Sequence, residues 1–429
     1  MSEAKSVVRE NALEGVRVID FSWIVAGPQC TRILADFGAD VIKIENYSNM
    51  DYIRASGGAD SPNRSPLFNT LNRNKRSLTL NVMHPRGMEL LKTLIKKSDV
   101  IVENFSSRVL EKWGLGYEEQ KKLNPGIIYC SMSGFGHSGR DRDFVTWGPT
   151  AQALSGLTYM SGLPGEESAG WGFSYMDHTG GFYGTIAIMM ALLHRNKTGE
   201  GQHLDLSQVE AGIGLTGTSV LDYTVNNRPF RRDGMPPGNR APEREIAPHN
   251  SYPCRGEDRW CVIAVTNDAE WDSLVNILGN PAWANDERFA TMASRFANQN
   301  DLDEFISQWT INLTPLEVFD VLQNAGVPAG AVQTPMERAE IDLQLKHRGF
   351  IAEVEHAELG NTKVESIPMK MSETPWKLNK ASPLLGEHSA EIYMDLLGVR
   401  SEEHTSELQS LVNLVCRLLL EKQKHKNNK

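Results

Sequence analysis

The sequence contains few cysteines, and they follow no recognisable pattern. The 429 residues include 5 cysteines with no CxxC spacing among them: Cys30, Cys130, Cys254, Cys261 and Cys416. An odd, scattered set provides neither a disulfide framework nor a zinc site. We therefore expect no metal centre, and we expect the protein to work in a reducing compartment, most simply the cytoplasm.

Signals for membranes, nucleic acids and nucleotides are also absent. No charged and then apolar leader begins the chain, and no apolar run reaches the roughly 20 residues that a bilayer crossing needs. A net charge of −10, with 40% hydrophobic and 23% charged residues, argues against disorder and against binding to nucleic acid or anionic membranes. The phosphate-binding patterns GxGxxG and GxxxxGK[ST] are missing. We expect a soluble protein with more than one domain.

Short apolar segments alternate with amphipathic ones in the first third of the chain. VRVIDF, QCTRILADFGA and DVIKIE predict strand, helix and strand, and the pattern recurs at RGMELLKTLIKKS, DVIVENF and GIIYCSMSGFG. This alternation predicts an α/β domain with a Rossmann-like parallel sheet covered on both faces. Ligands of such sheets bind beyond the carboxyl ends of the strands. Here those ends carry SWIVAGP, ENF and SGFG.

A segment rich in Pro, Arg and Gly, NNRPFRRDGMPPGNRAPEREIAPHN, interrupts the regular pattern and predicts a linker. Beyond it, SYPCRGEDRWCVIAV predicts a hairpin that turns at GED, and AEWDSLVNIL and LEVFDVLQNAGVPAG predict helices. We assign residues 1–225 to a large α/β domain and 226–330 to the linker with a smaller α+β domain. Residues 331–399 are expected to return to the large domain.

The end of the chain has a different character. From Arg400 it reads RSEEHTSELQS, which is what one reading frame of a widely used sequencing-library adapter encodes. We interpret residues 400–429 as an adapter-derived, non-native tail, so that Cys416 and the apolar LVNLVCRLLLEK carry no function. The alternative is an ordinary polar helix start followed by an apolar helix.

One carboxylate, Asp177, stands among aromatic and glycine residues in WGFSYMDHTGGFYG. A local explanation is that it caps a helix beginning near His178 or Thr179, because Asp is a favoured N-cap residue. The following GGFYGTIAIMMALL is apolar all round, which predicts a helix buried in the core, and its glycines permit close approach of a backbone or ligand. A poorly hydrated carboxylate at the mouth of such a helix is a good nucleophile. Asp177 is therefore a candidate catalytic residue.

Long blocks of sequence between Leu13 and Gly398 match the pattern of one enzyme family. They read LEGVRVIDFSWIVAGPQCTRILADFGADVIKIE, NRNKRSLTLNV, SDVIVENF, NPGIIYCSMSGFG, HRNKTGEGQHLDLSQVEA and PLLGEH. In these blocks the chain resembles the class III CoA-transferases, which include formyl-CoA transferase and carnitine CoA-transferase. The resemblance implies that Asp177 carries an acyl group as an anhydride and then CoA as a thioester. It also implies an interlocked homodimer, with the CoA thioester as substrate and no tightly bound cofactor.

The resemblance also implies a CoA pocket. The residues at CoA-lining positions of the family are Val25, Ala26, Leu80, Asn104, Phe105 and Lys112. Lys112 suits a phosphate as a point charge, although a solvated helix lysine is an equally good interpretation. Formyl-CoA transferase has glutamine at the position of Val25 and arginine at that of Asn46, and its tetraglycine loop has no counterpart here. These departures predict an acid bulkier than formate or oxalate.

Two alternatives share the fold. The related α-methylacyl-CoA racemases use an aspartate that corresponds to Asp177 and a histidine that corresponds to Trp147. Tryptophan cannot relay a proton, so we expect Trp147 to wall the acyl pocket instead. The second alternative is a subunit that pairs with a paralogue; the presence of Asp177 argues against a non-catalytic subunit and leaves a heteromeric enzyme open.

Other charged residues are weaker candidates. His137 and His178 are expected to be polar surface or capping residues rather than acid–base groups. The basic run NRNKR at residues 72–76 predicts a solvated loop or a contact with CoA phosphates. Arg54 and Arg244 are the candidates to reach the second carboxylate of a dicarboxylic substrate.

Overall fold

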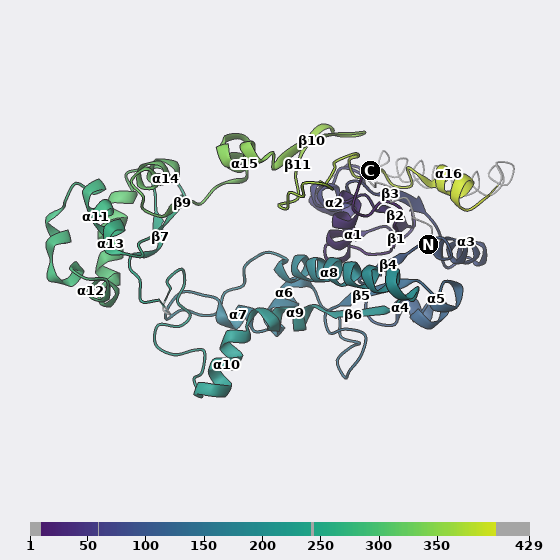
Figure 1. Ribbon diagram of the computed structural model, residues 1–429, viewed down its shortest axis with the longest axis horizontal. Coiled ribbons are helices and arrows are strands. Elements are labelled where there is room, and N and C mark those ends of the chain that lie inside the picture. Colours follow the sequence, from purple (N-terminus) through teal and green to yellow (C-terminus); the bar gives the residue numbers. More distant parts are fainter. Residues whose placement is uncertain (1–9, 59, 242–243, 400–429) are drawn as a thin grey trace, which may run out of the picture. The chain divides into compact units, whose positions relative to one another are not determined.

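The computed structural model describes residues 10–58, 60–241 and 244–399, so the expected non-native tail at 400–429 lies outside the described residues. The chain forms two compact units (Figure 1). The first contains the residues up to Leu157, Gly172–Thr216 and the residues from Gly349 on, and the second contains Thr158–Trp171 and Gly217–Arg348. The chain thus passes between the units near 158, 172, 217 and 349, whereas the sequence analysis divided it at 226 and 331.

A parallel sheet of six strands forms the centre of the first unit, in the order β3-β2-β1-β4-β5-β6. The strands are β1 (Arg17–Asp20), β2 (Asp40–Glu45), β3 (Arg76–Thr79), β4 (Val100–Glu103), β5 (Ile128–Ser133) and β6 (His203–Ser207). Val18 of β1 lies opposite Val41 on one side and Val100 on the other. The predicted Rossmann-like α/β fold is confirmed. β3 and β6 come from segments that the sequence analysis did not assign as strands.

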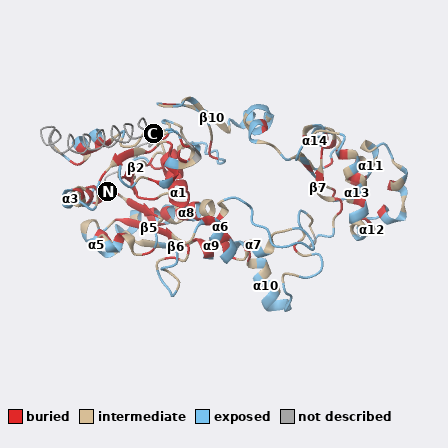
Figure 2. Cartoon of the chain, turned by 180° about the vertical axis from the view of Figure 1, so that it is seen from behind, coloured by how far each residue is buried: buried red, intermediate tan, exposed pale blue. Residues whose placement is uncertain are grey.

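Helices cover both faces of this sheet. The helices of the first unit are α1 (Ala26–Asp36), α2 (Pro66–Asn72), α3 (Pro85–Ile95), α4 (Val109–Lys112), α5 (Tyr117–Leu123), α6 (Gly148–Leu154), α8 (Tyr175–Thr198) and α9 (Gln208–Leu215). Successive residues of β1 point to opposite faces: Val18 packs with residues of α1 and α8, and Ile19 packs with residues of α3. Buried residues accordingly concentrate in β1, β2, β4, β5 and α1 (Figure 2).

The first unit also contains the antiparallel hairpin of β10 (Ile351–His356) and β11 (Gly360–Glu365), the short α16 (Ser389–Glu391), and two irregular turns of helix, η1 (Tyr52–Gly58) and η5 (Ile392–Leu396). Tyr393 of η5 packs with the α3 side of the sheet. The segment from residue 349 on is therefore part of the large unit, whereas residues 331–348 of the expected return segment belong to the second unit.

The second unit has a small antiparallel sheet of β7 (His249–Pro253), β8 (Trp260–Ala264) and β9 (Ala329–Ala331). Its helices are α10 (Gly217–Asn226), α11 (Asp268–Ile277), α12 (Met292–Ala297), α13 (Gln299–Thr310), α14 (Pro315–Asn324) and α15 (Leu343–Arg348). The short α7 (Leu157–Met160) lies where the chain first enters this unit. Three short helical turns complete it: η2 (Ala282–Asn285), η3 (Glu287–Phe289) and η4 (Glu337–Ile341). The predicted hairpin and helices are confirmed. Between α10 and β7, the described residues contain no helix or strand, as predicted for the linker.

The long helix α8 is not buried all round, so that expectation was wrong. One face carries the glycines together with Ile188, Ala191 and Leu192, all buried. The opposite face exposes large apolar side chains: Phe182, Tyr183, Ile186, Met190 and Leu193. Within the described ranges, none of the helices combines the length and apolar character that a membrane span requires. The exposed face of α8 therefore calls for a different explanation.

Candidate active site

A cavity of about 220 Å³ lies in the first unit, beyond the carboxyl ends of β1, β4 and β5. At each of these strands, three consecutive residues at or just after the carboxyl end line the cavity. Further lining residues come from the loop before α6 and from α8 and α9. The lining residues are Trp23, Ile24, Val25, Asn104, Phe105, Ser106, Met132, Ser133, Gly134, Phe144, Val145, Thr146, Trp147, Asp177 and Gln208. The rule that ligands sit beyond the strand ends thus located the three segments SWIVAGP, ENF and SGFG correctly.

Asp177 enters this cavity from the first turn of α8. The helix begins at Tyr175 and its N-cap residue is Ser174, so the local explanation of Asp177 as a cap for a helix beginning near residue 178 is wrong. Its backbone N–H donates to the Ser174 carbonyl at 3.1 Å. The neighbouring Met176 is buried among apolar residues, which fixes the turn and directs the carboxylate into the cavity.

The carboxylate of Asp177 is poorly hydrated but well supplied with donors. Burial raises its pKa from 3.8 to about 6, although hydrogen bonds from Gln208, from the Ser174 hydroxyl and from the Gly148 backbone N–H lower it. The Gln208 Nε2 atom lies 3.2 Å from Oδ1. Because desolvation is the largest cause, the group is ionised at neutral pH yet retains little water, which favours nucleophilic attack.

Gly148, the first residue of α6, allows the close approach of its backbone to this carboxylate. A Cβ atom at position 148 would stand 2.5 Å from Asp177 Oδ2 and 3.1 Å from the Cβ of Ser174. Real Cβ atoms do not approach an oxygen so closely, so only glycine fits without displacement of the carboxylate. The glycine therefore makes room for the Asp177 carboxylate and supplies an N–H donor to it.

One part of the cavity wall is built by the turn after β1 and the turn after β4. The side-chain amide of Asn104 binds both backbone groups of Trp23: its Oδ1 accepts from the Trp23 N–H at 2.7 Å and its Nδ2 donates to the Trp23 carbonyl at 2.8 Å. Phe105 packs edge-on against Trp23, with ring centroids 5.5 Å apart. These contacts hold the two turns together as one wall.

The residues proposed from sequence fall into two groups. Val25, Asn104, Phe105, Trp147 and Asp177 all line the cavity. The others lie outside its lining: Ala26 is buried as the first residue of α1, Leu80 is buried just after β3, and Lys112 is exposed at the end of α4.

The sequence analysis missed three residues that touch the Asp177 carboxylate: Gly148, Ser174 and Gln208. Gln208 follows β6 directly, so the strand-end rule would have identified it if β6 had been recognised. Gly148 follows Trp147, and no local signal marks it as a neighbour of residue 177.

Two expectations for basic residues were wrong. Arg73 and Lys75 are neither solvated nor placed for phosphates, because both side chains are fully buried in ion pairs, Arg73 with Asp36 at 2.7 Å and Lys75 with Asp20 at 3.0 Å. Unpaired burial of such charges is unfavourable, so the carboxylates explain their position.

Arg54 does not reach the cavity either. Its side chain is fully buried and paired with Glu45 at 2.7 Å. Arg244 is exposed in the second unit. Among the described residues that line the cavity there is no lysine or arginine, so a second carboxylate of a substrate has no fixed cation in this wall.

The two candidate histidines also lie outside the cavity lining. The His137 side chain is only 8% exposed, with Nε2 3.4 Å from Oε1 of the buried Glu103, so its assignment to the surface was wrong. His178 stacks on Phe173 with ring centroids 5.0 Å apart. Burial lowers the pKa of both imidazoles. Among the described residues, no cluster of three or more His, Cys, Asp or Glu side chains is arranged to hold a metal ion.

Comparisons with known proteins agree with this geometry. Residues 13–389 match the model of CoA-transferase family III. The chain is 34% identical over 391 residues to the succinyl-CoA–D-citramalate CoA-transferase of Chloroflexus aurantiacus, covering 91% of this chain and 95% of the relative. It is 35% identical over 396 residues to the succinate–glutarate CoA-transferase of Agrobacterium fabrum, covering 90% and 96%.

A solved structure gives the same result. The crystal structure of a CAIB/BAIF family protein from Brucella suis superposes with a TM-score of 0.82 at 33% identity, covering 90% of this chain and all of that one. The match extends over both the sheet of the first unit and the smaller second unit, since it spans nearly the whole chain. The chain belongs to CoA-transferase family III and is a class III CoA-transferase.

Proposed function

We propose that this enzyme moves CoA from an acyl-CoA thioester to a free carboxylic acid, with Asp177 carrying first the acyl group and then the CoA. One observation carries the proposal. Asp177 is the one ionisable side chain among the described residues that line the cavity, and it is desolvated there. A carboxylate in that state is suited to attack a thioester carbonyl.

The chemistry balances without any other reactant. The Asp177 carboxylate attacks the thioester carbonyl, which forms an aspartyl–acyl anhydride and releases CoA thiolate. The thiolate attacks Cγ of Asp177, which releases the donor carboxylate and leaves an aspartyl-CoA thioester. The acceptor carboxylate then attacks Cγ and displaces the thiolate. The thiolate finally attacks the acceptor's carbonyl, so that the new thioester leaves and the Asp177 carboxylate is restored.

The donors around Asp177 have a role in these steps. When one oxygen of Asp177 is bonded to an acyl group, the other carries the negative charge that develops as the thiolate adds to Cγ. Gln208 at Oδ1 and the Gly148 N–H supply hydrogen bonds to this carboxyl group in the resting enzyme. Donors that are already in place stabilise such an oxyanion without reorganisation.

The racemase alternative is less well supported. A racemase needs a second acid–base group facing the α-carbon of the acyl chain. The corresponding position is Trp147, and the nearest candidate histidines lie outside the lining of the cavity. We therefore assign Trp147, whose side chain is 55% exposed, to the wall that the acyl group contacts.

We infer that the donor is a dicarboxylic acyl-CoA such as succinyl-CoA. Both relatives described above are named for succinyl-CoA or succinate. In this wall a distal carboxylate would meet neutral donors, because Asn104, Ser106, Ser133 and Thr146 are polar and no cation lines the cavity. CoA is a substrate in this scheme, with Val25, Ala26, Leu80, Asn104, Phe105 and Lys112 as its proposed contacts and no resident cofactor.

We also propose that the enzyme is an interlocked homodimer that works in the cytoplasm. The exposed apolar face of α8 supports the dimer, because Ile186, Met190 and Leu193 are each more than half exposed in the isolated chain. A contiguous apolar face of this kind usually marks an interface. Molar mass in solution, measured by light scattering, tests the stoichiometry, and a monomer would refute it.

The covalent route is tested by intact-mass measurement. Wild-type enzyme and the Asp177→Asn variant are incubated with succinyl-CoA or acetyl-CoA and then quenched with hydroxylamine or borohydride. We expect a mass change in the wild type alone, mapped to the peptide that contains Asp177, and greater with succinyl-CoA.

Two results would contradict the proposal. An adduct at another residue would remove Asp177 from the covalent role. Normal turnover by Asp177→Ala would exclude any covalent aspartyl intermediate. Exchange of the α-proton with solvent, without any adduct from a panel of acyl-CoAs, would instead favour the racemase.

A further inference from the structure

Ile24 adopts a backbone conformation that β-branched residues rarely adopt. Its φ angle is +66°, in the left-handed region that glycine favours and where a branched Cβ crowds the backbone. Ile24 lines the cavity between Trp23 and Val25. A residue in such a conformation persists only when surrounding contacts fix it, so the contacts of this turn need an explanation.

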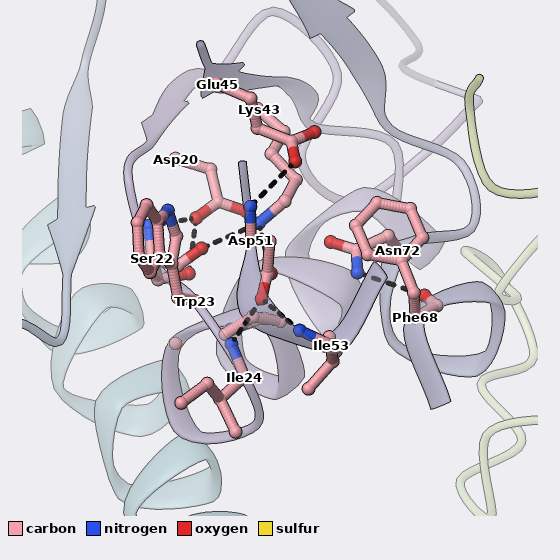
Figure 3. A network of polar contacts seen from close by, with 12 residues as sticks. Asp20, Ser22, Trp23, Ile24, Lys43, Glu45, Asp51, Ile53, Phe68 and Asn72 are labelled. Carbon is pink, nitrogen blue, oxygen red and sulfur yellow. Dashed lines mark hydrogen bonds and ion pairs between the residues drawn. The ribbon is translucent and has the colours of Figure 1, made fainter. Parts of the chain in front are cut away.

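The carboxylate of Asp51 supplies the contact from the inner side of the turn. Its Oδ1 accepts from the Ile24 N–H at 3.0 Å and from the Ile53 N–H at 3.2 Å. Figure 3 shows Asp51 between these two amides and the ammonium group of Lys43. One buried oxygen therefore ties the strained residue to the start of η1.

Lys43 fixes Asp51 in turn. The Lys43 Nζ atom lies 3.0 Å from Asp51 Oδ2, and both side chains are fully buried. The same Nζ donates to the Ser22 carbonyl at 2.6 Å, and the Ser22 N–H donates to Asp20 Oδ1 at 2.9 Å. Ser22 and Ile24, the residues on each side of Trp23, are thus held by buried charged groups (Figure 3).

On its outer side the turn is held by Asn104, which binds both backbone groups of Trp23. The turn is consequently held by two side chains: Asp51, which is buried and does not line the cavity, and Asn104, which lines it. The conformation of Ile24 decides where Val25 stands and where α1 begins, since Val25 is the N-cap residue of α1. A shift of this turn would move one wall of the cavity that contains Asp177.

We propose that Asp51 is a positioning residue of the transferase: through the amide of Ile24, it holds the strained turn that forms one wall of the cavity containing Asp177. The inference rests on the proposed function of that cavity. Asp51 does not line the cavity, so its effect on catalysis passes through the backbone of Ile24.

The first experiment replaces Asp51 by asparagine, which keeps the shape of the side chain. Aspartate has two acceptor oxygens, one for the amides of Ile24 and Ile53 and one for Lys43. Asparagine has a single acceptor oxygen, so it can accept either from the two amides or from Lys43. The matched control is Asp36→Asn, because Asp36 is equally buried and paired with Arg73 at 2.7 Å but lies at the other end of α1.

Hydrogen–deuterium exchange of the peptide containing Ile24 gives a readout that does not depend on activity. We expect faster exchange there in Asp51→Asn and unchanged exchange there in Asp36→Asn. We further expect kcat/KM, per folded molecule, to fall at least about tenfold in Asp51→Asn, because small misplacements at a site carry large rate penalties. The Asp36→Asn variant should lose stability without this loss.

Combination with Ile24→Gly tests the route of the effect. Glycine adopts a positive φ without strain, so Ile24→Gly should recover a large part of the activity lost in Asp51→Asn, and it should not improve Asp36→Asn. If Asp51→Asn does not accumulate as folded protein, the same glycine should restore folding. A rescue specific to residue 51 is not expected of a merely structural ion pair.

Two outcomes would overturn the proposal. Equal exchange at Ile24 in Asp51→Asn and wild type would show that the carboxylate does not hold the turn. A double variant no better than Asp51→Asn, in activity or in folding, would show that Asp51 acts elsewhere. If the wild type itself lacked transferase activity, the proposed function would fail, while the exchange and folding measurements would still decide the role of Asp51.

Discussion

A Cβ atom on Gly148 would stand 2.5 Å from Oδ2 of Asp177. The two residues are 29 positions apart in the sequence, and they meet because α6 and α8 both begin at the rim of the cavity. The missing side chain of Gly148 is therefore as much a part of the site as the carboxylate of Asp177. In the proposed mechanism, it leaves room for an acyl group on that oxygen.

Replacement of Gly148 by alanine should reduce kcat/KM by roughly 100-fold or more, because the methyl group displaces the nucleophile and its donors. The thermal midpoint should change little, since the cavity is partly open to solvent. Gly214→Ala is the control, because nothing lies within 4 Å of a Cβ at that helical position. Steady-state kinetics on both variants check this, and a fully active Gly148→Ala would contradict the crowding argument.

The pH dependence of kcat/KM should have an acidic limb that is set by the ionisation of Asp177. Burial raises the pKa of this carboxyl from 3.8 to about 6, and in the proposed mechanism only the ionised form attacks the thioester. We expect log kcat/KM to rise with a slope of one up to about pH 6 and then to level. A pH–rate profile with substrates that do not titrate in this range checks it. A flat profile down to about pH 4 would mean that Asp177 is less desolvated than the geometry indicates.

The same desolvation means that the ionised form of Asp177 should lower the stability of the folded protein. Because the pKa in the folded state is raised from 3.8 to about 6, the folded protein binds the proton more tightly and loses stability as pH rises through this window. Asp177→Asn removes the ionisable group, so its free energy of unfolding should exceed that of the wild type by on the order of 1–2 kcal/mol at about pH 8.

The control for this effect is pH itself. Below the ordinary pKa of 3.8 the wild-type side chain is neutral in both states, so the gain from Asp177→Asn should disappear as the pH is lowered. Denaturant titrations at several pH values measure the difference. A gain that does not depend on pH would point to packing rather than charge.

The sequence predicted the strands and loops around this site better than the residues that contact Asp177. Apolar runs such as VRVIDF and DVIVENF are short and rich in β-branched residues, which favours buried strands, and the strand-end rule follows from their parallel arrangement. That was sufficient to place the segments SWIVAGP and ENF around one cavity, and the family resemblance singled out Val25, Asn104 and Phe105 within them. It was not sufficient for Gly148, whose importance depends on the position of another helix.

Charges and long-range partners account for most of the errors. Arg73 and Lys75 stand in a run that looks solvated, but Asp36 and Asp20, which precede them by 37 and 55 positions, pair with them in the interior. The left-handed conformation of Ile24 has no local signal either, since isoleucine disfavours it. In each case the decisive partner lies far away in the sequence, where no local pattern reaches it.

Gln208 provides the most direct test of the donors at the nucleophile. Its Nε2 atom lies 3.2 Å from Asp177 Oδ1, and this hydrogen bond lowers the pKa of the carboxyl against the larger effect of burial. In Gln208→Leu the apolar side chain fills a similar volume but donates nothing. We therefore expect the acidic limb of the pH–rate profile to move upward by about half to one pH unit.

The rate on the plateau should fall as well, by about tenfold or more, because the donor also stabilises the charge that develops on the aspartyl oxygen. Gln152→Leu is the matched control: Gln152 is buried on α6, its Nε2 has no hydrogen-bond partner, and it does not line the cavity. Kinetics across pH on both variants separate the two roles. A lower plateau with an unmoved limb would assign Gln208 to the transition state alone, and unchanged kinetics would remove it from the site.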